Sequence, residues 1–202
     1  MNDDAQLLRA WGGGDDRAGA TLYRRHFDAL YRFFRTKAPD DYEDLIQTTM
    51  LECVRSKDRF RGEAPFRAFL FGVARHTLLH HFRSRFRDRL DFDSSRSSVA
   101  DLDPRPSTIA ARNAENHRLL EAMRTIPMDL QIVLEMHYWE EMGTKELSAT
   151  LEIPQGTVKS RLRRAREALR EVLETGGRPA GGDEEVLDGQ VRALRAIVDE
   201  DG

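Results

Sequence analysis

The stretch that decides the fold reads GTVKSRLRRAR and runs from Gly156 to Arg166. Its apolar residues continue into the next turn, at Val158, Leu162, Ala165 and Leu169. Steps of four, three and four residues place these side chains on one face of an α-helix. Residues 158–170 include six basic side chains and one acidic one. The stretch therefore predicts a helix with one buried face and a basic surface.

A short helix and a tight turn are predicted directly before it. Residues 144–152 form the short helix, with Leu147 and Leu151 facing inward. The small Ser148 stands where a neighbouring helix must come close. The next residues, IPQG at 153–156, have the composition of a turn. A short helix, a turn and a long basic helix form the helix-turn-helix, which places the start of its second helix in the major groove of DNA.

The candidate DNA contacts lie at the start of the basic helix, and all of them except Arg163, Arg161 included, are expected to lie off its apolar stripe. Arginine can read guanine there with two hydrogen bonds, whereas lysine and serine hold phosphates. The predicted set is Thr157, Lys159, Ser160, Arg161, Arg163 and Arg164. The alternative is a solvated basic helix on an ordinary helical domain. The turn and the small residue at the crossing favour the DNA-binding interpretation.

The run from Gly156 to Arg166, together with Ile126 and Pro127, resembles the C-terminal promoter-binding domain of a family of bacterial RNA polymerase subunits. This is the sigma-70 family of sigma factors, in its extracytoplasmic-function (ECF) class. The resemblance implies that the domain reads the minus-thirty-five promoter element. Gly143 departs from the family pattern, in which serine is frequent, and Gln131 stands where arginine is frequent. Glycine can still cap a helix at a small cost, so the expected fold is unchanged.

A second stretch, DYEDLIQ at residues 41–47, resembles the core-binding helix of the same family. Carboxylates beside an apolar stripe suit docking on a basic helical partner. The resemblance implies that this partner is core RNA polymerase, through the clamp helices of its largest subunit and through its flap. The implied contacts are Glu43, Asp44, Gln47 and Leu51. Taken alone, the same cluster could be a solvated helix start that the helix dipole favours.

A third stretch, PFRAFLFGVARH at residues 65–76, resembles the DNA-melting segment of the family, which continues through 82–85. Strand opening needs a basic track and a pocket for an unstacked base, whose stacking contributes about 1–3 kcal/mol. We expect that pocket in the loop 58–64, and we expect Phe66 and Phe69 in the core beside it. The predicted minus-ten and melting contacts are Arg61, Arg75, His76, His80, Arg83 and Arg85.

No metal or other cofactor is predicted. His76 and His80 stand one helical turn apart, a spacing that can hold zinc, but no third ligand lies nearby in sequence. The single cysteine, Cys53, cannot form an internal disulfide, and we expect it to be a small buried residue.

We predict an all-α fold of two small helical domains joined by a flexible linker, because helical spacing recurs and strand-like alternation is absent. The expected domains are a region 2 domain at 1–91 and a four-helix region 4 domain at 110–174, which contains the helix-turn-helix. The linker is placed at 92–109 by its serine and proline content. An acidic C-terminal extension follows at 175–202. The predicted helices are 4–11, 16–37, 41–57, 65–90, 110–125, 128–141, 144–152, 155–173 and 184–199.

The C-terminal extension has two open interpretations. Residues 184–199 have an apolar stripe on a glycine-rich tether, and a lone helix of this length is marginal in water. It could bury that stripe on the sigma domains themselves, on polymerase or on an anti-sigma factor. Residues 174–202 hold eight acidic and three basic side chains, which favours competition with promoter DNA inside the free protein. The alternative is a mostly disordered, solubilising tail.

Charge and composition limit the possible functions. The formal net charge is −3, but basic side chains cluster locally, and local patches decide nucleic-acid binding more than the total does. The acidic N-terminus lacks the apolar core of a signal peptide, and no apolar run is long enough to cross a bilayer. We therefore expect a cytoplasmic protein.

Together these features predict an alternative sigma factor. It would bind core RNA polymerase, direct it to specific promoters and promote strand opening, with no covalent chemistry of its own. An anti-sigma factor is a further expected partner. Two other classes remain open at this point: a dimeric helix-turn-helix activator that never enters polymerase, and a metal-dependent nuclease that uses the His/Arg segment. Co-elution with core polymerase would separate them.

Overall fold

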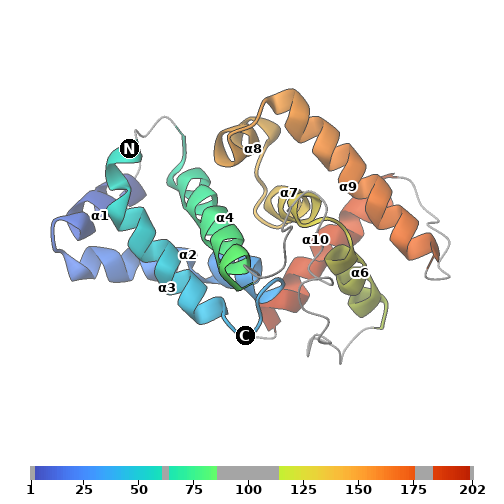
Figure 1. Ribbon diagram of the computed structural model, residues 1–202, viewed down its shortest axis with the longest axis horizontal. Helices are drawn as coiled ribbons and strands as arrows, with labels where there is room; N and C mark the ends of the chain where they lie inside the picture. Colours follow the sequence, from blue (N-terminus) through green and yellow to red (C-terminus); the bar gives the residue numbers. More distant parts are fainter. Residues whose placement is uncertain (1–2, 61–63, 86–113, 176–183, 201–202) are drawn as a thin grey trace. The chain divides into compact units, whose positions relative to one another are not determined.

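The computed structural model describes residues 3–60, 64–85, 114–175 and 184–200, which are helical apart from short turns (Figure 1). These residues divide into two compact units. The prediction of an all-α fold is confirmed for them. The predicted linker, 92–109, lies outside the described residues, and so does the candidate residue Arg61. None of the helices within the described ranges combines the length and the apolarity needed to span a membrane.

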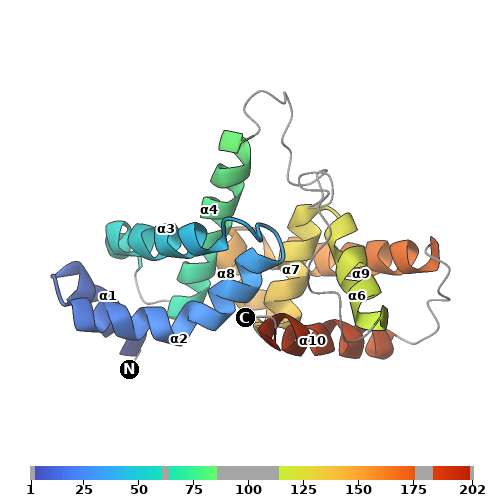
Figure 2. The same cartoon turned by 90° about the horizontal axis from the view of Figure 1, so that it is seen from below.

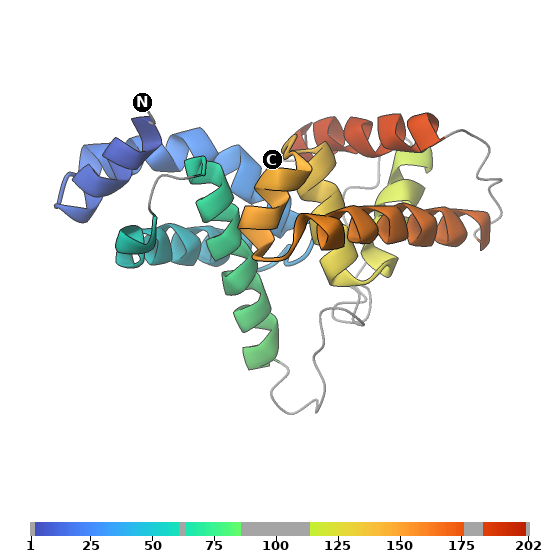
Figure 3. The same cartoon turned by 90° about the horizontal axis from the view of Figure 1, so that it is seen from above.

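In its described residues up to Arg85, the first unit holds four α-helices and a short 3-10 turn. Their bounds are α1 (Asp3–Gly12), α2 (Asp16–Arg35), α3 (Tyr42–Arg55), η1 (Lys57–Arg59) and α4 (Phe66–Arg85). Helix α3 packs against both α2 and α4, and Figures 2 and 3 show α4 crossing α3. The predicted apolar stripes supply the core. Its fully buried members include Leu22, Phe34, Ile46, Cys53, Phe66, Leu70 and Ala74.

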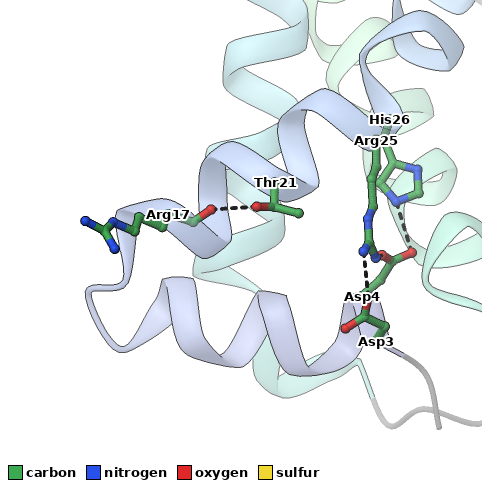
Figure 4. Close-up of polar contacts among 6 residues, drawn as sticks. All are labelled: Asp3, Asp4, Arg17, Thr21, Arg25 and His26. Atoms are coloured by element: carbon green, nitrogen blue, oxygen red, sulfur yellow. Dashed lines mark hydrogen bonds and ion pairs between the residues drawn. The ribbon is translucent and has the colours of Figure 1, made fainter.

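Helices α1 and α2 form a hairpin in which polar contacts join the start of α1 to the middle of α2 (Figure 4). Arg25 lies 2.6 Å from Asp3 and 2.8 Å from Asp4, and Nε2 of His26 lies 3.1 Å from the other oxygen of Asp4. At the turn, Asp15 caps α2 by accepting hydrogen bonds from the next backbone amides. The preceding Gly14 has φ of 100°, a conformation that favours glycine.

The second unit holds α6 (Ala114–Thr125), α7 (Met128–Tyr138), the first turn of α8 (Thr144–Leu151), α9 (Gln155–Thr175) and α10 (Glu184–Glu200). Helices α6 and α7 contact one another, and both contact α9. Helix α7 ends three residues before the predicted Glu141. Glu141 has φ of 53°, which stops the helix and lets Met142 turn inward, where its amide donates to the carbonyl of Met136.

The C-terminal extension forms a helix and packs on its own unit. Helix α10 contacts α6 and α7, and Figures 2 and 3 show it lying across this pair. The alternative of a mostly disordered tail is therefore wrong for residues 184–200. Of the three surfaces considered for this helix, the structure shows the intramolecular one.

Candidate nucleic-acid interface

The basic helix α9 begins directly after Pro154, whose carbonyl accepts hydrogen bonds from the amides of Thr157 and Val158. Its apolar stripe is buried as predicted, at Val158, Leu162, Ala165 and Leu169, and burial continues to Leu173. The side-chain amide of Gln155 donates to the hydroxyl of Thr144 over 2.7 Å. This bond ties the start of α9 to the start of α8, so the two helices of the predicted helix-turn-helix are joined at their N-termini.

The outer face of α9 is an exposed polar surface formed by Lys159, Ser160, Arg163 and Arg164. Thr157 is half-buried beside them. Arg163 pairs with Glu167 at 2.6 Å, but both side chains are more than half exposed. An exposed pair of this kind is worth little, so a phosphate could take the place of the carboxylate at small cost. These four side chains are therefore available to a ligand from solvent.

Two other arginines of α9 face the body of the unit. Nε of Arg161 lies 3.5 Å from Oδ2 of Asp129, at the start of α7, and Arg161 is only 20% exposed. Arg166 donates from Nε to the hydroxyl of Tyr138 over 2.7 Å. The interpretation that Arg161 lies off the apolar stripe is wrong. It follows Val158 by three positions and precedes Ala165 by four, and that spacing already put it on the edge of the stripe.

The predicted core-binding residues lie together on α3. Glu43, Asp44, Gln47 and Leu51 are exposed, and their spacing of one, three and four positions follows one side of the helix. Leu51 is 51% exposed, which is unusual for a large apolar side chain next to a packed core. Tyr42 donates its hydroxyl to Glu43 over 3.1 Å, and this bond raises the pKa of Tyr42. The cluster thus presents two carboxylates beside an uncovered leucine.

The described minus-ten candidates all lie on α4. His76, His80, Arg83 and Arg85 are exposed, and Arg75 is half-buried. Positions 76, 80 and 83 follow one another at helical spacing, so they share a face. Arg85 differs from the rest because its Nη1 lies 2.6 Å from Oδ2 of Asp41, directly before α3. Arg85 therefore joins the end of the melting segment to the start of the core-binding helix.

An aromatic cluster supports the loop where we expected the base pocket. Phe60 packs at 5.7 Å from Phe66 and 5.4 Å from Phe69, measured between ring centroids, and Phe66 is buried. The expectation that Phe66 belongs to the core is confirmed, whereas Phe69 is half-buried. Phe60 was not singled out from the sequence. An aromatic residue inside an otherwise polar loop was the signal that could have identified it.

The structure gives no chemical role to Cys53, and it shows no metal site among the described residues. Cys53 is fully buried, and burial raises the pKa of its thiol to about 12, which confirms its interpretation as a small core residue. Among the described residues there is no group of three His, Cys, Asp or Glu side chains that could hold a metal ion.

Comparison with known proteins decides the family. Residues 22–88 match sigma-70 region 2, and residues 116–169 match sigma-70 region 4. The chain belongs to the sigma-70 family. Its two described units thus contain the two regions that were predicted from separate stretches of sequence.

Named relatives place it in the ECF class. The chain is 29% identical to the RNA polymerase sigma factor HrpL of Pseudomonas syringae pv. syringae, over 69% of this chain and 77% of HrpL. It is 26% identical to the ECF RNA polymerase sigma-E factor of Escherichia coli strain K12, over 82% of this chain and 92% of that factor. The protein is an ECF sigma factor that directs RNA polymerase to promoters, and this family acts by binding and not as enzymes.

Solved structures share the fold. One is CnrH in complex with the cytosolic domain of CnrY, with a TM-score of 0.55, 24% identity and coverage of 86% of this chain and 98% of that one. Another is the sigma factor RpoE in complex with the anti-sigma factor NepR from Bartonella quintana. It has a TM-score of 0.58, 22% identity and coverage of 77% of this chain and 96% of that one.

Proposed function

We propose that this sigma factor divides promoter recognition and polymerase docking among three separate surfaces. The outer face of α9 contacts the minus-thirty-five element through Lys159, Ser160, Arg163 and Arg164, with Thr157 beside them. The face of α4 that carries His76, His80 and Arg83, with Arg75 and Arg61, serves minus-ten recognition and strand opening. The α3 surface of Glu43, Asp44, Gln47 and Leu51 docks on the polymerase clamp helices.

The observation that carries this proposal is the split between the faces of α9. Its apolar stripe is buried in the domain core, whereas Lys159, Arg163 and Arg164 are exposed along the first half of the helix. Three cations on one exposed face attract a phosphate backbone, which supports DNA binding by this face.

Strand opening follows from the first unit. A base that leaves the stack needs an aromatic platform or a pocket, and Phe60 anchors the end of the loop in which we place it. The exposed cations of α4 would hold the phosphates of the displaced strand. An unpaired base in the pocket and a phosphate track beside it together lower the free energy of the opened duplex relative to the closed one.

The test uses the whole chain. Co-elution with core polymerase on gel filtration, followed by transcription from promoters mapped after overexpression, should show one initiating complex. Retention of polymerase binding but no promoter-specific transcription would overturn the DNA assignments. Failure to co-elute would overturn the assignment of α3 as the polymerase-docking surface.

Regulation by an anti-sigma factor is part of the proposal. Two solved structures of the same fold hold a second protein: CnrH is in complex with the cytosolic domain of CnrY, and the sigma factor RpoE is in complex with the anti-sigma factor NepR. We infer that a protein of this kind also holds the present factor, in the cytoplasm where polymerase works. Co-purification of the tagged chain from cells would identify such a partner, and its addition should block polymerase binding in vitro.

A further inference from the structure

Helix α10 packs on α6 and α7 through one face. Its buried residues, Leu187, Val191, Leu194 and Val198, recur in steps of four, three and four, while Val186 and Ala193 face solvent. Its outer face is therefore uncovered, and a single stripe makes the apolar contact. We call the surface beneath it the α10 groove, which is formed by α6 and α7.

Specific polar bonds fix α10 in this groove. The hydroxyl of Tyr138 donates to Asp188 of α10, and Arg166 of α9 donates to the same carboxylate over 3.1 Å. The indole Nε1 of Trp139 donates to the backbone carbonyl of Val191 over 2.7 Å. We refer to these bonds, together with the one described next, as the polar clasp.

The polar clasp also includes a hydrogen bond in which α10 supplies the donor. Arg195 of α10 donates to the carbonyl of Trp139 over 2.6 Å, at the end of α7, where helix carbonyls lack partners. The guanidinium of Arg192 lies 5.3 Å from the centre of the Tyr138 ring. A generic apolar contact would not need this pairing, so the position of α10 is specified.

The domain beneath α10 has its own core without it. Residues 116–169 match region 4 of the family, and α10 lies beyond that match. Helices α6, α7 and α9 contact one another directly. A lone helix of the length of α10 is marginal in water. Helix α10 is thus an addition that can leave without removing the core.

If α10 left, the apolar surface beneath it would be exposed to water, which is unfavourable. Trp139, Tyr138 and Arg166 would also lose the acceptors that α10 supplies. A replacement must bring an apolar stripe and a carboxylate at the position of Asp188. Lys159, Arg163 and Arg164 of α9 are exposed, and Arg163 pairs with Glu167 of its own helix, so we expect the exchange to leave the proposed DNA-binding face as it is.

We propose that α10 is an exchangeable intramolecular ligand of the region 4 domain. The groove it fills accepts in its place an amphipathic helix of a partner protein that presents an acidic residue to Tyr138 and Arg166. The free factor therefore holds a protein-docking surface closed, and release of α10 opens it. This inference takes only the boundary of region 4 from the family assignment and does not depend on the proposed DNA contacts.

The test measures binding of a fluorescent synthetic peptide of residues 184–200 to the full-length chain. In the wild-type chain the tethered α10 competes, so the peptide should bind weakly. Asp188→Asn in the chain removes the carboxylate from the tethered helix and should tighten peptide binding by about tenfold or more. Glu185→Gln removes an equal charge from an exposed position of α10 and should leave binding as in the wild type.

Two further measurements make the result decisive. Arg195→Gln in the chain breaks the bond to Trp139 and should also tighten peptide binding, while a peptide that itself carries Asp188→Asn should bind worse. Hydrogen exchange should be faster in α10 than in α7, and faster still in α10 of the Asp188→Asn chain.

Equal protection of α10 and α7, or no gain in peptide binding in either variant, would overturn the proposal. Concentration-dependent dimers that share α10 would overturn its intramolecular form. The α10 variants should co-elute with core polymerase like the wild type. The proposal on α10 and the proposed polymerase-docking surface can therefore fail separately.

Discussion

Nε of Arg161 in the recognition helix lies 3.5 Å from Oδ2 of Asp129 at the start of α7, whereas Arg164, one turn further on, is exposed to solvent. Arginines that look equivalent in the sequence therefore have different surroundings. Arg161 neutralises a carboxylate that is 5% exposed, and Arg164 is available to DNA. The two substitutions should produce different failures.

Arg164→Ala should weaken specific DNA binding by about 1–3 kcal/mol and leave the fold intact, if its side chain reads a base edge. Lys159→Ala should weaken binding on all sequences and reduce its salt dependence, because lysine contacts phosphate. Fluorescence anisotropy over a salt series measures both effects. If both variants bound a mapped promoter and random DNA like the wild type, α9 would not be the recognition helix.

Arg161→Ala should instead destabilise the second unit by about 1–3 kcal/mol, because it leaves the Asp129 carboxylate buried without this partner. Hydrogen exchange of α7 and α9 measures the change within the full chain. The paired variant Arg161→Ala with Asp129→Asn should recover part of the loss, as expected for groups in contact. A stable Arg161→Ala chain with the same DNA defect as Arg164→Ala would show that Arg161 reads DNA.

The contrast between Arg161 and Arg164 shows where sequence reasoning is sufficient. Helix bounds follow from local spacing and from residues such as Pro127 and Pro154, so most predicted ends lie within about two residues of the observed ones. The end of α7 was missed because Glu141 adopts a left-handed conformation with no glycine to mark it. The apolar stripe of α9 was correct, and stricter use of the same spacing would have placed Arg161 beside it.

The polar clasp around α10 could not have been predicted in the same way. Tyr138 and Asp188 are fifty positions apart, and their bond depends on how α7 and α10 pack. Local periodicity shows that α10 has a face to bury, but it carries no information on which surface receives it. The prediction that the acidic tail competes with promoter DNA rests on its net charge, and no contact in the structure tests it. The observed contacts of α10 are with α6 and α7, and with Arg166 of α9.

Asp44→Lys should reduce binding to core polymerase while leaving the chain folded. Asp44 is exposed on α3 between Glu43 and the docking side chains of Gln47 and Leu51, so a reversed charge would oppose a basic partner. Asp28→Lys is the matched control, because Asp28 is an exposed aspartate on the neighbouring helix α2. Gel filtration with core polymerase and circular dichroism measure the two properties. Equal co-elution of a folded Asp44→Lys chain and the control would remove α3 from the interface.

Arg83→Ala should slow open-complex formation more than it weakens closed-complex binding. Arg83 is exposed on the melting helix, so its loss removes a cation from the phosphate track without disturbing packing. Permanganate footprinting on a linear promoter follows strand opening. A template with a pre-melted bubble should restore activity, and failure of that rescue would contradict a role in melting.

Arg85→Ala should have a broader effect than Arg83→Ala. The 2.6 Å pair between Arg85 and Asp41 links α4 to the start of α3, where the polymerase-binding residues begin. We therefore expect Arg85→Ala to weaken polymerase co-elution as well as strand opening, whereas Asp41→Asn should reproduce only the polymerase defect. If the Arg83 and Arg85 variants behaved identically in both assays, the ion pair between Arg85 and Asp41 would not contribute to polymerase binding.

The first unit should lose stability in mild acid, in part through His81. Burial lowers the pKa of His81 below its ordinary value of 6.5, although Asp41, whose Oδ2 lies 3.4 Å away, acts in the opposite direction. A depressed pKa means that the unfolded chain binds more protons than the folded one in this window. Neutral His81 therefore makes its full contribution to the stability of the fold above pH 6.5, and this contribution is lost as the pH falls through the folded-state pKa. His81→Gln should flatten the fall in stability between about pH 7 and pH 5, when hydrogen exchange in α3 and α4 is compared with the wild type. His80→Gln, an exposed neighbour on the same helix, should keep the wild-type slope. If the His81 and His80 variants had the same slope, the acid sensitivity would come from other groups of this unit.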